Sequence, residues 1–188
     1  RGERRGPRAG LQGDEAVTPG PTEAGKEASP AGPEARPPRP YPEAHNDLGR
    51  VLYDIGQSEQ AIAEFRTAIE QRGGDFARAH HSLGLALFDL GRMDESIEAL
   101  REAIGQQPTF PRAYRNLGRA LYRVSDLDGA INALRTAIDQ RDGAFPEAFH
   151  DLGLAYFSKG QLDESIGAQR KAIEQSGRFA EAHFWLGA

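Results

Sequence analysis

Four arginines lie close together in the stretch 112–123, at spacings of three, four and four residues. On a helix, side chains three and four residues apart share one face, so this spacing would align four guanidinium groups. Guanidinium groups donate forked, charge-assisted hydrogen bonds to carboxylates. Like charges at i,i+4 destabilise a helix by about 0.2–0.5 kcal/mol per pair, so a ligand or neighbouring acids must compensate. We call these residues the arginine stripe: Arg112, Arg115, Arg119 and Arg123.

The chain around the stripe is acidic, with a formal net charge of -5 over 188 residues. Nucleic-acid binding depends on an excess of positive charge, so we expect no nucleic acid partner. The absence of cysteine excludes disulfides, zinc–thiolate sites and cysteine nucleophiles. No apolar run reaches the length of about 18 residues that a spanning helix needs, so we expect no membrane insertion in this segment.

Residues that could carry catalysis or hold a metal are sparse. No two histidines have the His-x3-His spacing that would present both rings on one helix face. The acidic pairs Asp94-Glu95 and Asp163-Glu164 stand at predicted helix starts, where negative charge favours the helix dipole. No glycine-rich phosphate loop occurs. We therefore expect no enzyme activity, no cofactor and no metal.

The first part of the chain differs in composition from the rest. Residues 1–40 hold eight prolines, seven glycines and six alanines, and their only larger apolar side chains are Leu11 and Val17. Such a segment cannot bury enough apolar surface to offset the entropy of ordering it. We predict a disordered linker over residues 1–41. The proline-rich stretch 36–42 is an alternative, as a ligand for another domain.

The remainder of the chain is a repeat. Leucine-glycine pairs recur at spacings of 35, 34, 35 and 34 residues, which implies a longer unit of 69 residues. The pairs are Leu48-Gly49, Leu83-Gly84, Leu117-Gly118, Leu152-Gly153 and Leu186-Gly187. The predicted repeats span 42–76, 77–110, 111–145 and 146–179, followed by a truncated fifth repeat at 180–188.

Each repeat has the apolar periodicity of two helices. Gly56, Gly91 and Gly160 suit left-handed turns between the two, while Ser125 replaces that glycine and predicts a looser corner in repeat three. The glycines of the leucine-glycine pairs let the two helices approach closely. An aromatic residue precedes each repeat and is expected to pack between neighbouring repeats: Tyr41, Phe76, Phe110, Phe145 and Phe179.

These recurring residues resemble the tetratricopeptide repeat family over residues 42–188. A small residue opens each second helix and an alanine follows seven residues later: Ala61, Ser96, Ala130 and Ser165, then Ala68, Ala103, Ala137 and Ala172. The family's leading tryptophan is replaced throughout, and its closing proline occurs only as Pro108. The resemblance implies an all-α, helix-turn-helix repeat solenoid with a right-handed twist. In the family, positions 2, 5, 9, 12 and 13 of each repeat point into a concave groove lined by the first helices.

The resemblance places the whole arginine stripe in that groove and implies a protein–protein interaction scaffold. A basic groove with aromatic residues suits a protein or acidic peptide partner. The candidate peptide-binding residues are Arg50, Arg78, His81, Arg112, Arg115, Arg119, Tyr122 and Arg123. The family's carboxylate clamp for chaperone tails is not predicted, because its lysine and asparagine positions hold other residues here, such as Asn46 and Arg50 in repeat one.

Alternatives remain open. The arginines could pair with acids on neighbouring first helices (Asp54, Asp89, Glu147 and Asp151), and the aromatic line at position 12 could pack between repeats (Tyr53, Phe88, Tyr122 and Phe157). Because the chain begins at Arg1 and stops at Ala188 inside a repeat, we expect a fragment of a longer bacterial chain. It could be the docking arm of a glycosyltransferase-like or kinase-like enzyme, or self-associate through its open C-terminal end. The compartment stays open between cytoplasm, slightly favoured, and periplasm.

Overall fold

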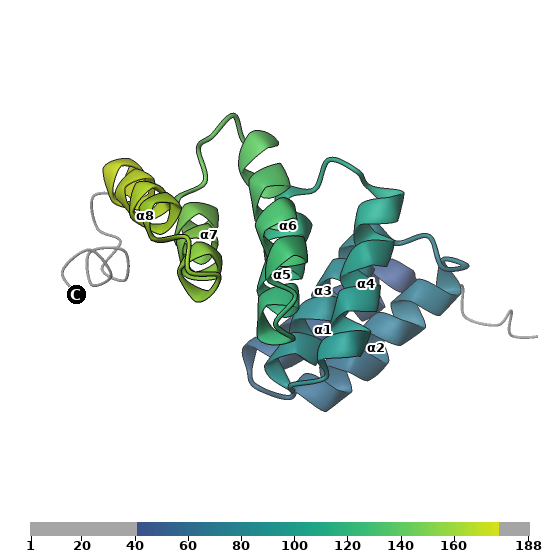
Figure 1. Ribbon diagram of the computed structural model, residues 1–188. Helices are drawn as coiled ribbons and strands as arrows, with labels where there is room; N and C mark the ends of the chain where they lie inside the picture. The colour runs from purple at the N-terminus through teal and green to yellow at the C-terminus, as the bar shows by residue number, and fades with distance from the viewer. Residues whose placement is uncertain (1–40, 177–188) are drawn as a thin grey trace, which may run out of the picture. The chain divides into compact units, whose positions relative to one another are not determined.

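The computed structural model describes residues 41–176, which form helices and connecting turns without strands (Figure 1). The predicted all-α fold is therefore confirmed. Predictions for residues 1–40 and for the truncated fifth repeat, including Phe179 and the open C-terminal end, lie outside the described residues. The helices are α1 (Pro42–Asp54), α2 (Ser58–Gln71), α3 (Ala77–Asp89), α4 (Met93–Gln106), α5 (Pro111–Arg123), α6 (Leu127–Asp139), α7 (Pro146–Ser158) and α8 (Leu162–Ser176).

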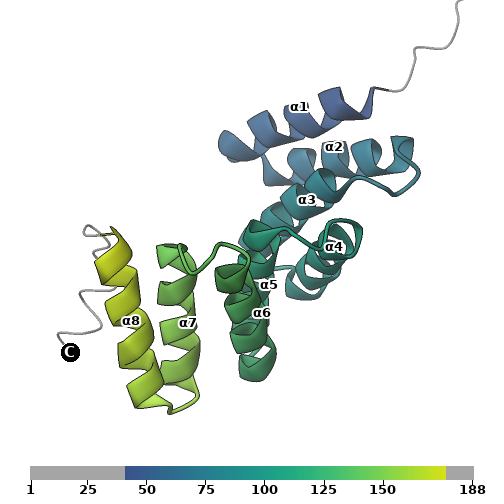
Figure 2. The ribbon, with the colours of Figure 1, turned by 90° about the horizontal axis from the view of Figure 1, so that it is seen from above.

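Consecutive helices pack as pairs, and each pair stacks on the next. The pairs are α1 with α2, α3 with α4, α5 with α6 and α7 with α8, and the second helix of each pair contacts the first helix of the next. The first helices also contact one another in succession, α1 with α3, α3 with α5 and α5 with α7 (Figure 2). They therefore share one side of the stack, the side on which the groove is expected.

The two helices of a pair approach closely at the glycine of each leucine-glycine pair. A methyl group at Gly118 would lie 2.6 Å from Cγ of Leu134 and 3.2 Å from the carbonyl oxygen of Ala130. Both distances are shorter than ordinary van der Waals contact. A residue larger than glycine there requires the Leu134 side chain to move or α5 and α6 to separate.

The small residue that opens the second helix faces this same glycine. In repeats two and four it is a buried serine whose hydroxyl donates to the glycine carbonyl: Ser96 to Gly84 at 2.7 Å and Ser165 to Gly153 at 2.9 Å. In repeats one and three it is a fully buried alanine, Ala61 or Ala130. Alanine and serine therefore alternate at this position from repeat to repeat, which agrees with the 69-residue unit that the sequence predicts.

The turn inside repeat three corrects one prediction. Ser125 adopts the left-handed conformation of the equivalent glycines, with a φ of 65°. The Ser125 amide donates to the carbonyl of Tyr122 at 3.0 Å and the Asp126 amide to that of Leu121 at 2.9 Å, as at the Gly56 turn. The Asp126 carboxylate also accepts from the Gly129 amide at 2.9 Å and caps α6. The looser corner expected here is therefore wrong, because these hydrogen bonds hold a residue that tolerates the conformation less well than glycine.

The aromatic residues that precede the repeats differ in burial along the array. Phe76 and Phe145 are buried between neighbouring repeats, as predicted. Phe110 is half-buried and its ring centroid lies 4.8 Å from that of His81. Tyr41 is 67% exposed, so the prediction is wrong for repeat one, because no described helix precedes α1.

Among the helices of residues 41–176, none is long and apolar enough to cross a membrane.

We expect Gly118→Ala to destabilise the protein by about 1–3 kcal/mol, because the added methyl overpacks the contact with Leu134. The matched control is Gly167→Ala, where α8 leaves open space for a methyl group. That change should instead stabilise by about 0.5–1 kcal/mol, because alanine favours the helix. Urea unfolding monitored by circular dichroism measures both, and equal effects of the two variants would contradict the close approach.

Candidate functional site

Helix α5 carries the arginine stripe because its two faces differ in chemistry. Its apolar face, with Ala113, Leu117 and Leu121, is buried against the neighbouring helices. The arginines lie on the remaining surface, where Arg115 and Arg119 are half-buried and Arg112 and Arg123 are exposed. The apolar period of α5 thus fixes the direction of the basic side chains.

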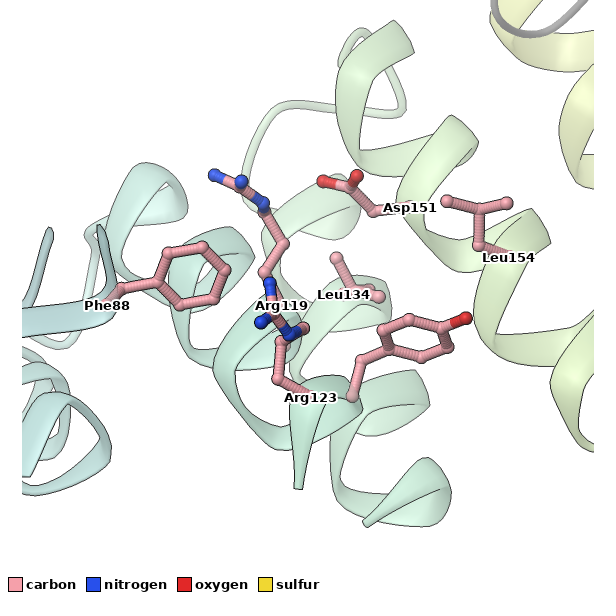
Figure 3. Close-up of a pocket in the computed structure, with 8 residues that line it drawn as sticks. Phe88, Arg119, Arg123, Leu134, Asp151 and Leu154 are labelled. Carbon is pink, nitrogen blue, oxygen red and sulfur yellow. The ribbon is translucent and has the colours of Figure 1, made fainter. Parts of the chain in front are cut away.

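Three adjoining cavities run along the first helices, and we call them together the groove. Cavity A, of about 420 Å³, lies among α1, α3 and α5. Cavity B, of about 370 Å³, lies among α3, α5 and α7. Cavity C, of about 230 Å³, lies among α3, α5, α6 and α7 (Figure 3). Cavities A and B share His81, Leu85 and Arg112, and cavities B and C share Arg119.

Every residue that the sequence singled out for the groove lines at least one of these cavities. Those residues are Arg50, Arg78, His81, Arg112, Arg115, Arg119, Tyr122 and Arg123. The structure therefore brings them to one continuous surface on the side of the first helices.

Arg115 is held by an acid of the next repeat. Its Nε donates to Oδ2 of Asp151 at 2.6 Å, and both side chains are largely buried. Burial raises the pKa of Asp151 above its ordinary value, although the Arg115 guanidinium acts in the opposite direction. For this arginine, the alternative of pairing with a neighbouring acid is right.

The other three arginines of the stripe have no such partner. Within residues 41–176, no carboxylate lies within ion-pair distance of Arg112, Arg119 or Arg123. Arg119 and Arg123 instead stack on the ring of Phe88, with Cζ 4.8 Å and 5.7 Å from its centroid. Figure 3 shows their side chains between Phe88 on one side and Asp151 on the other. Ion pairing within the described array therefore accounts for one arginine of four.

The aromatic line at position 12 connects successive repeats by hydrogen bonds. The Tyr53 hydroxyl donates to the carboxylate of Asp89, and the Tyr122 hydroxyl lies 3.0 Å from Oγ of Ser158. Burial, and then the bond to Asp89, raise the pKa of Tyr53 to about 12. Packing between repeats, the alternative for this line, is thus right for both tyrosines, although Tyr122 also lines cavity C.

His81 contributes a neutral ring to the groove. Its Nε2 accepts from Nδ2 of Asn116 at 2.9 Å. Burial, and then the positive charge of Arg112, lower the pKa of His81 to about 4. Near neutral pH the positive charge of cavity B therefore comes from arginine alone.

Sequence reasoning missed several residues of cavity B. Arg141, from the turn between α6 and α7, lines it and stacks on the ring of Phe145 at 4.8 Å. Asn116 and Phe145 line it as well. Arg141 lies in the glycine-based turn that replaces the family's closing proline, and only the extra length of that turn could have drawn attention to it.

The described residues show little sign of other chemistry. Within residues 41–176, no three His, Asp or Glu side chains gather into a group that could hold a metal ion. Glu147 is an acidic side chain on the wall of cavity B, and Asp54 has that role in cavity A. The groove is therefore basic at α5, with acidic side chains at its margins.

Comparison with known proteins agrees with this architecture. The tetratricopeptide repeat family model matches residues 46–111 and 115–178, two segments that begin 69 residues apart. A crystal structure of MamA is 30% identical, with a TM-score of 0.69, and the match covers 76% of this chain and 82% of that one.

Two further structures share the fold at lower identity. The structure of YrrB, described as a TPR protein with an unusual peptide-binding site, is 20% identical, with a TM-score of 0.70, and the match covers 78% of this chain and 75% of that one. Pseudomonas aeruginosa PilF is 23% identical, with a TM-score of 0.68, and the match covers 75% of this chain and 64% of that one. No curated protein sequence matches the chain.

We expect Arg115→Gln to destabilise the protein by about 1–3 kcal/mol, because it leaves the Asp151 carboxyl buried without its partner. The matched control is Arg112→Gln, which breaks no ion pair of the described array and should change stability by less than about 0.5 kcal/mol. Urea unfolding of both variants tests this difference. A loss in Arg115→Gln no larger than that in the control would show that the ion pair does not stabilise the stack.

We expect His81 to titrate near pH 4 in NMR spectra of the folded protein. Because this pKa lies below the ordinary value of about 6.5, the unfolded chain binds the proton first. The neutral ring therefore contributes stability that is present above about pH 6.5 and is lost as pH falls toward 4. Arg112→Gln should raise the His81 pKa only in part, since burial is the larger cause, and Arg101→Gln is the control. A His81 pKa near 6.5 in the wild type would contradict the burial.

Proposed function

Because the chain belongs to the tetratricopeptide repeat family, we propose that it is a protein–protein interaction scaffold whose groove binds an acidic peptide segment of a partner protein. The single observation that carries this proposal is the state of Arg112, Arg119 and Arg123. They line the groove, and no carboxylate within residues 41–176 lies within ion-pair distance of them. Positive charge concentrated on one surface of an acidic chain favours a ligand of opposite charge.

The way the arginines are held suits recognition of carboxylates. Stacking on the ring of Phe88 leaves the N–H groups at the edges of the Arg119 and Arg123 guanidinium planes available for forked hydrogen bonds. It also restricts the side chains before a ligand arrives, which lowers the entropy lost on binding. Charge-assisted hydrogen bonds of this kind contribute about 1.5–3 kcal/mol each.

Arg115 has a structural role within the stripe, because its ion pair with Asp151 joins α5 to α7. Replacing Arg115 by an acid would set two carboxyl groups against each other at Asp151 and disturb the packing of α5 on α7. Arg112 and Arg119 lack such a partner in the described array, so they are the residues whose charge can be reversed with the fold retained. The fold itself is compatible with the proposal, since YrrB, which shares it, is described as having a peptide-binding site.

We expect Arg112→Glu combined with Arg119→Glu to weaken binding of an acidic probe peptide, built of alternating glutamate and serine, by more than about tenfold. The control is Arg101→Glu combined with Arg170→Glu, which changes net charge equally at exposed sites on the second helices α4 and α8. Isothermal titration calorimetry gives the affinities, and circular dichroism confirms the helices. Equal losses in both variants, or no binding by the wild type, would overturn the proposal.

A further inference from the structure

We infer that the groove recognises two side chains of its ligand together, an acidic one in cavity B and a bulky apolar one in cavity C, two residues apart on an extended segment. This inference rests on the proposed function and specifies the sequence that the groove selects. It follows from the different linings of the two cavities and from their separation along α5.

Cavity B has the lining of an acid site. Arg112, Arg115, Arg119 and Arg141 all line it, and of these only Arg115 has a carboxylate partner within the described residues. The Glu147 carboxylate on its wall balances one further charge at most. An incoming carboxylate would therefore meet guanidinium groups that have no ion-pair partner in the described array, both from α5 and from the turn before α7.

Cavity C combines an apolar wall with the charged side chains of Arg119, Arg123 and Asp151. Phe88, Tyr122, Leu134 and Leu154 form the apolar part of its wall, and Gly118 lies among its lining residues. Its volume is about 230 Å³. A cavity of about 150 Å³ holds a benzene ring, so this space can accept a leucine or phenylalanine side chain. Asp151, the one acid on its lining, is already bonded to Arg115.

The separation of the cavities sets the spacing of the two side chains. On α5, cavity B is lined by residues 112, 115, 116 and 119, and cavity C by residues 118, 119, 122 and 123. The centres of these sets lie about five residues apart, or about 7.5 Å along a helix that rises 1.5 Å per residue. In an extended segment, residues i and i+2 point to the same side and lie about 6.6 Å apart. An acidic residue and an apolar residue with one residue between them therefore match the two cavities.

The shared wall between the cavities supports a joint site. Arg119 lines both of them, and its guanidinium stacks on Phe88, which lines cavity C. An apolar side chain beside Phe88 would exclude water from the Arg119 guanidinium and so strengthen its bond to a carboxylate in cavity B. A ligand that presents the acidic and apolar side chains two residues apart should therefore bind more tightly than one with a different spacing or without the apolar side chain.

The test uses the whole chain and four unlabelled peptides in isothermal titration calorimetry. Two spaced peptides carry Glu-Ser-Leu or Leu-Ser-Glu, the adjacent peptide carries Glu-Leu-Ser, and the acidic peptide carries Glu-Ser-Ser, all between identical Gly-Ser flanks. We expect one spaced peptide to bind about tenfold more tightly than the adjacent and acidic peptides, because only its leucine enters cavity C. Adjacent residues of an extended segment point to opposite sides.

Two substitutions of Leu154 assign the preference to cavity C. Leu154→Trp fills the cavity and Leu154→Ser removes part of its apolar wall, so each should abolish the difference in affinity between the spaced and adjacent peptides. The control Leu162→Trp makes the same change at an exposed site on α8 and should keep the preference. Equal affinity of wild type for spaced and adjacent peptides, or a preference that survives both Leu154 variants, would overturn the inference alone. Failure of all four peptides to bind would overturn this inference, and failure of the alternating glutamate-serine probe as well would overturn the proposed function with it.

Discussion

The structure depends on one constraint, that a single helix pair cannot cover its own apolar face. The first described helix shows the cost of an uncovered face. Leu48 on α1 is 48% exposed, whereas its equivalents Leu83, Leu117 and Leu152 are 8%, 8% and 5% exposed beneath the second helix of the preceding repeat. Each repeat therefore derives much of its burial from a neighbour. The glycine contact inside each pair keeps the two helices close enough for that stacking to continue.

Stacking uses only the apolar faces of the first helices, so their groove side can carry charged side chains. Because the apolar stripe of α5 supplies its packing, the opposite side can hold four arginines despite their mutual repulsion. Two kinds of contact offset the repulsion, an ion pair at Arg115 and stacking on Phe88 at Arg119 and Arg123. The ion pair joins two repeats and belongs to the packing. The stacked arginines form no ion pair within the described array, so their guanidinium groups can still bind a carboxylate.

The sequence predicts the repeated parts of this structure well, because periodicity reports burial directly. Helices and glycine contacts follow from one repeat of 34 or 35 residues, whereas the groove positions of the stripe come from the resemblance to the family. Contacts between individual side chains of neighbouring repeats cannot be predicted from the repeat period, because they depend on how far each helix pair is rotated relative to the next. The sequence thus offered four acids for the stripe, and only the structure selects Asp151 for Arg115. It likewise could not show that His81 is buried, or that Arg141 reaches cavity B from a turn.

Variation between repeats at equivalent positions limits the length of the basic surface. Position 2 is acidic in repeats one and four and basic between them, as Glu43, Arg78, Arg112 and Glu147 show. Position 13 is acidic in repeats one and two and turns basic only at Arg123. A long acidic segment would therefore meet repulsion at the margins of the groove, while a short one would meet α5 alone. Variation between the repeats thus concentrates the positive charge of the groove around α5, which favours a short acidic segment over an extended acidic surface.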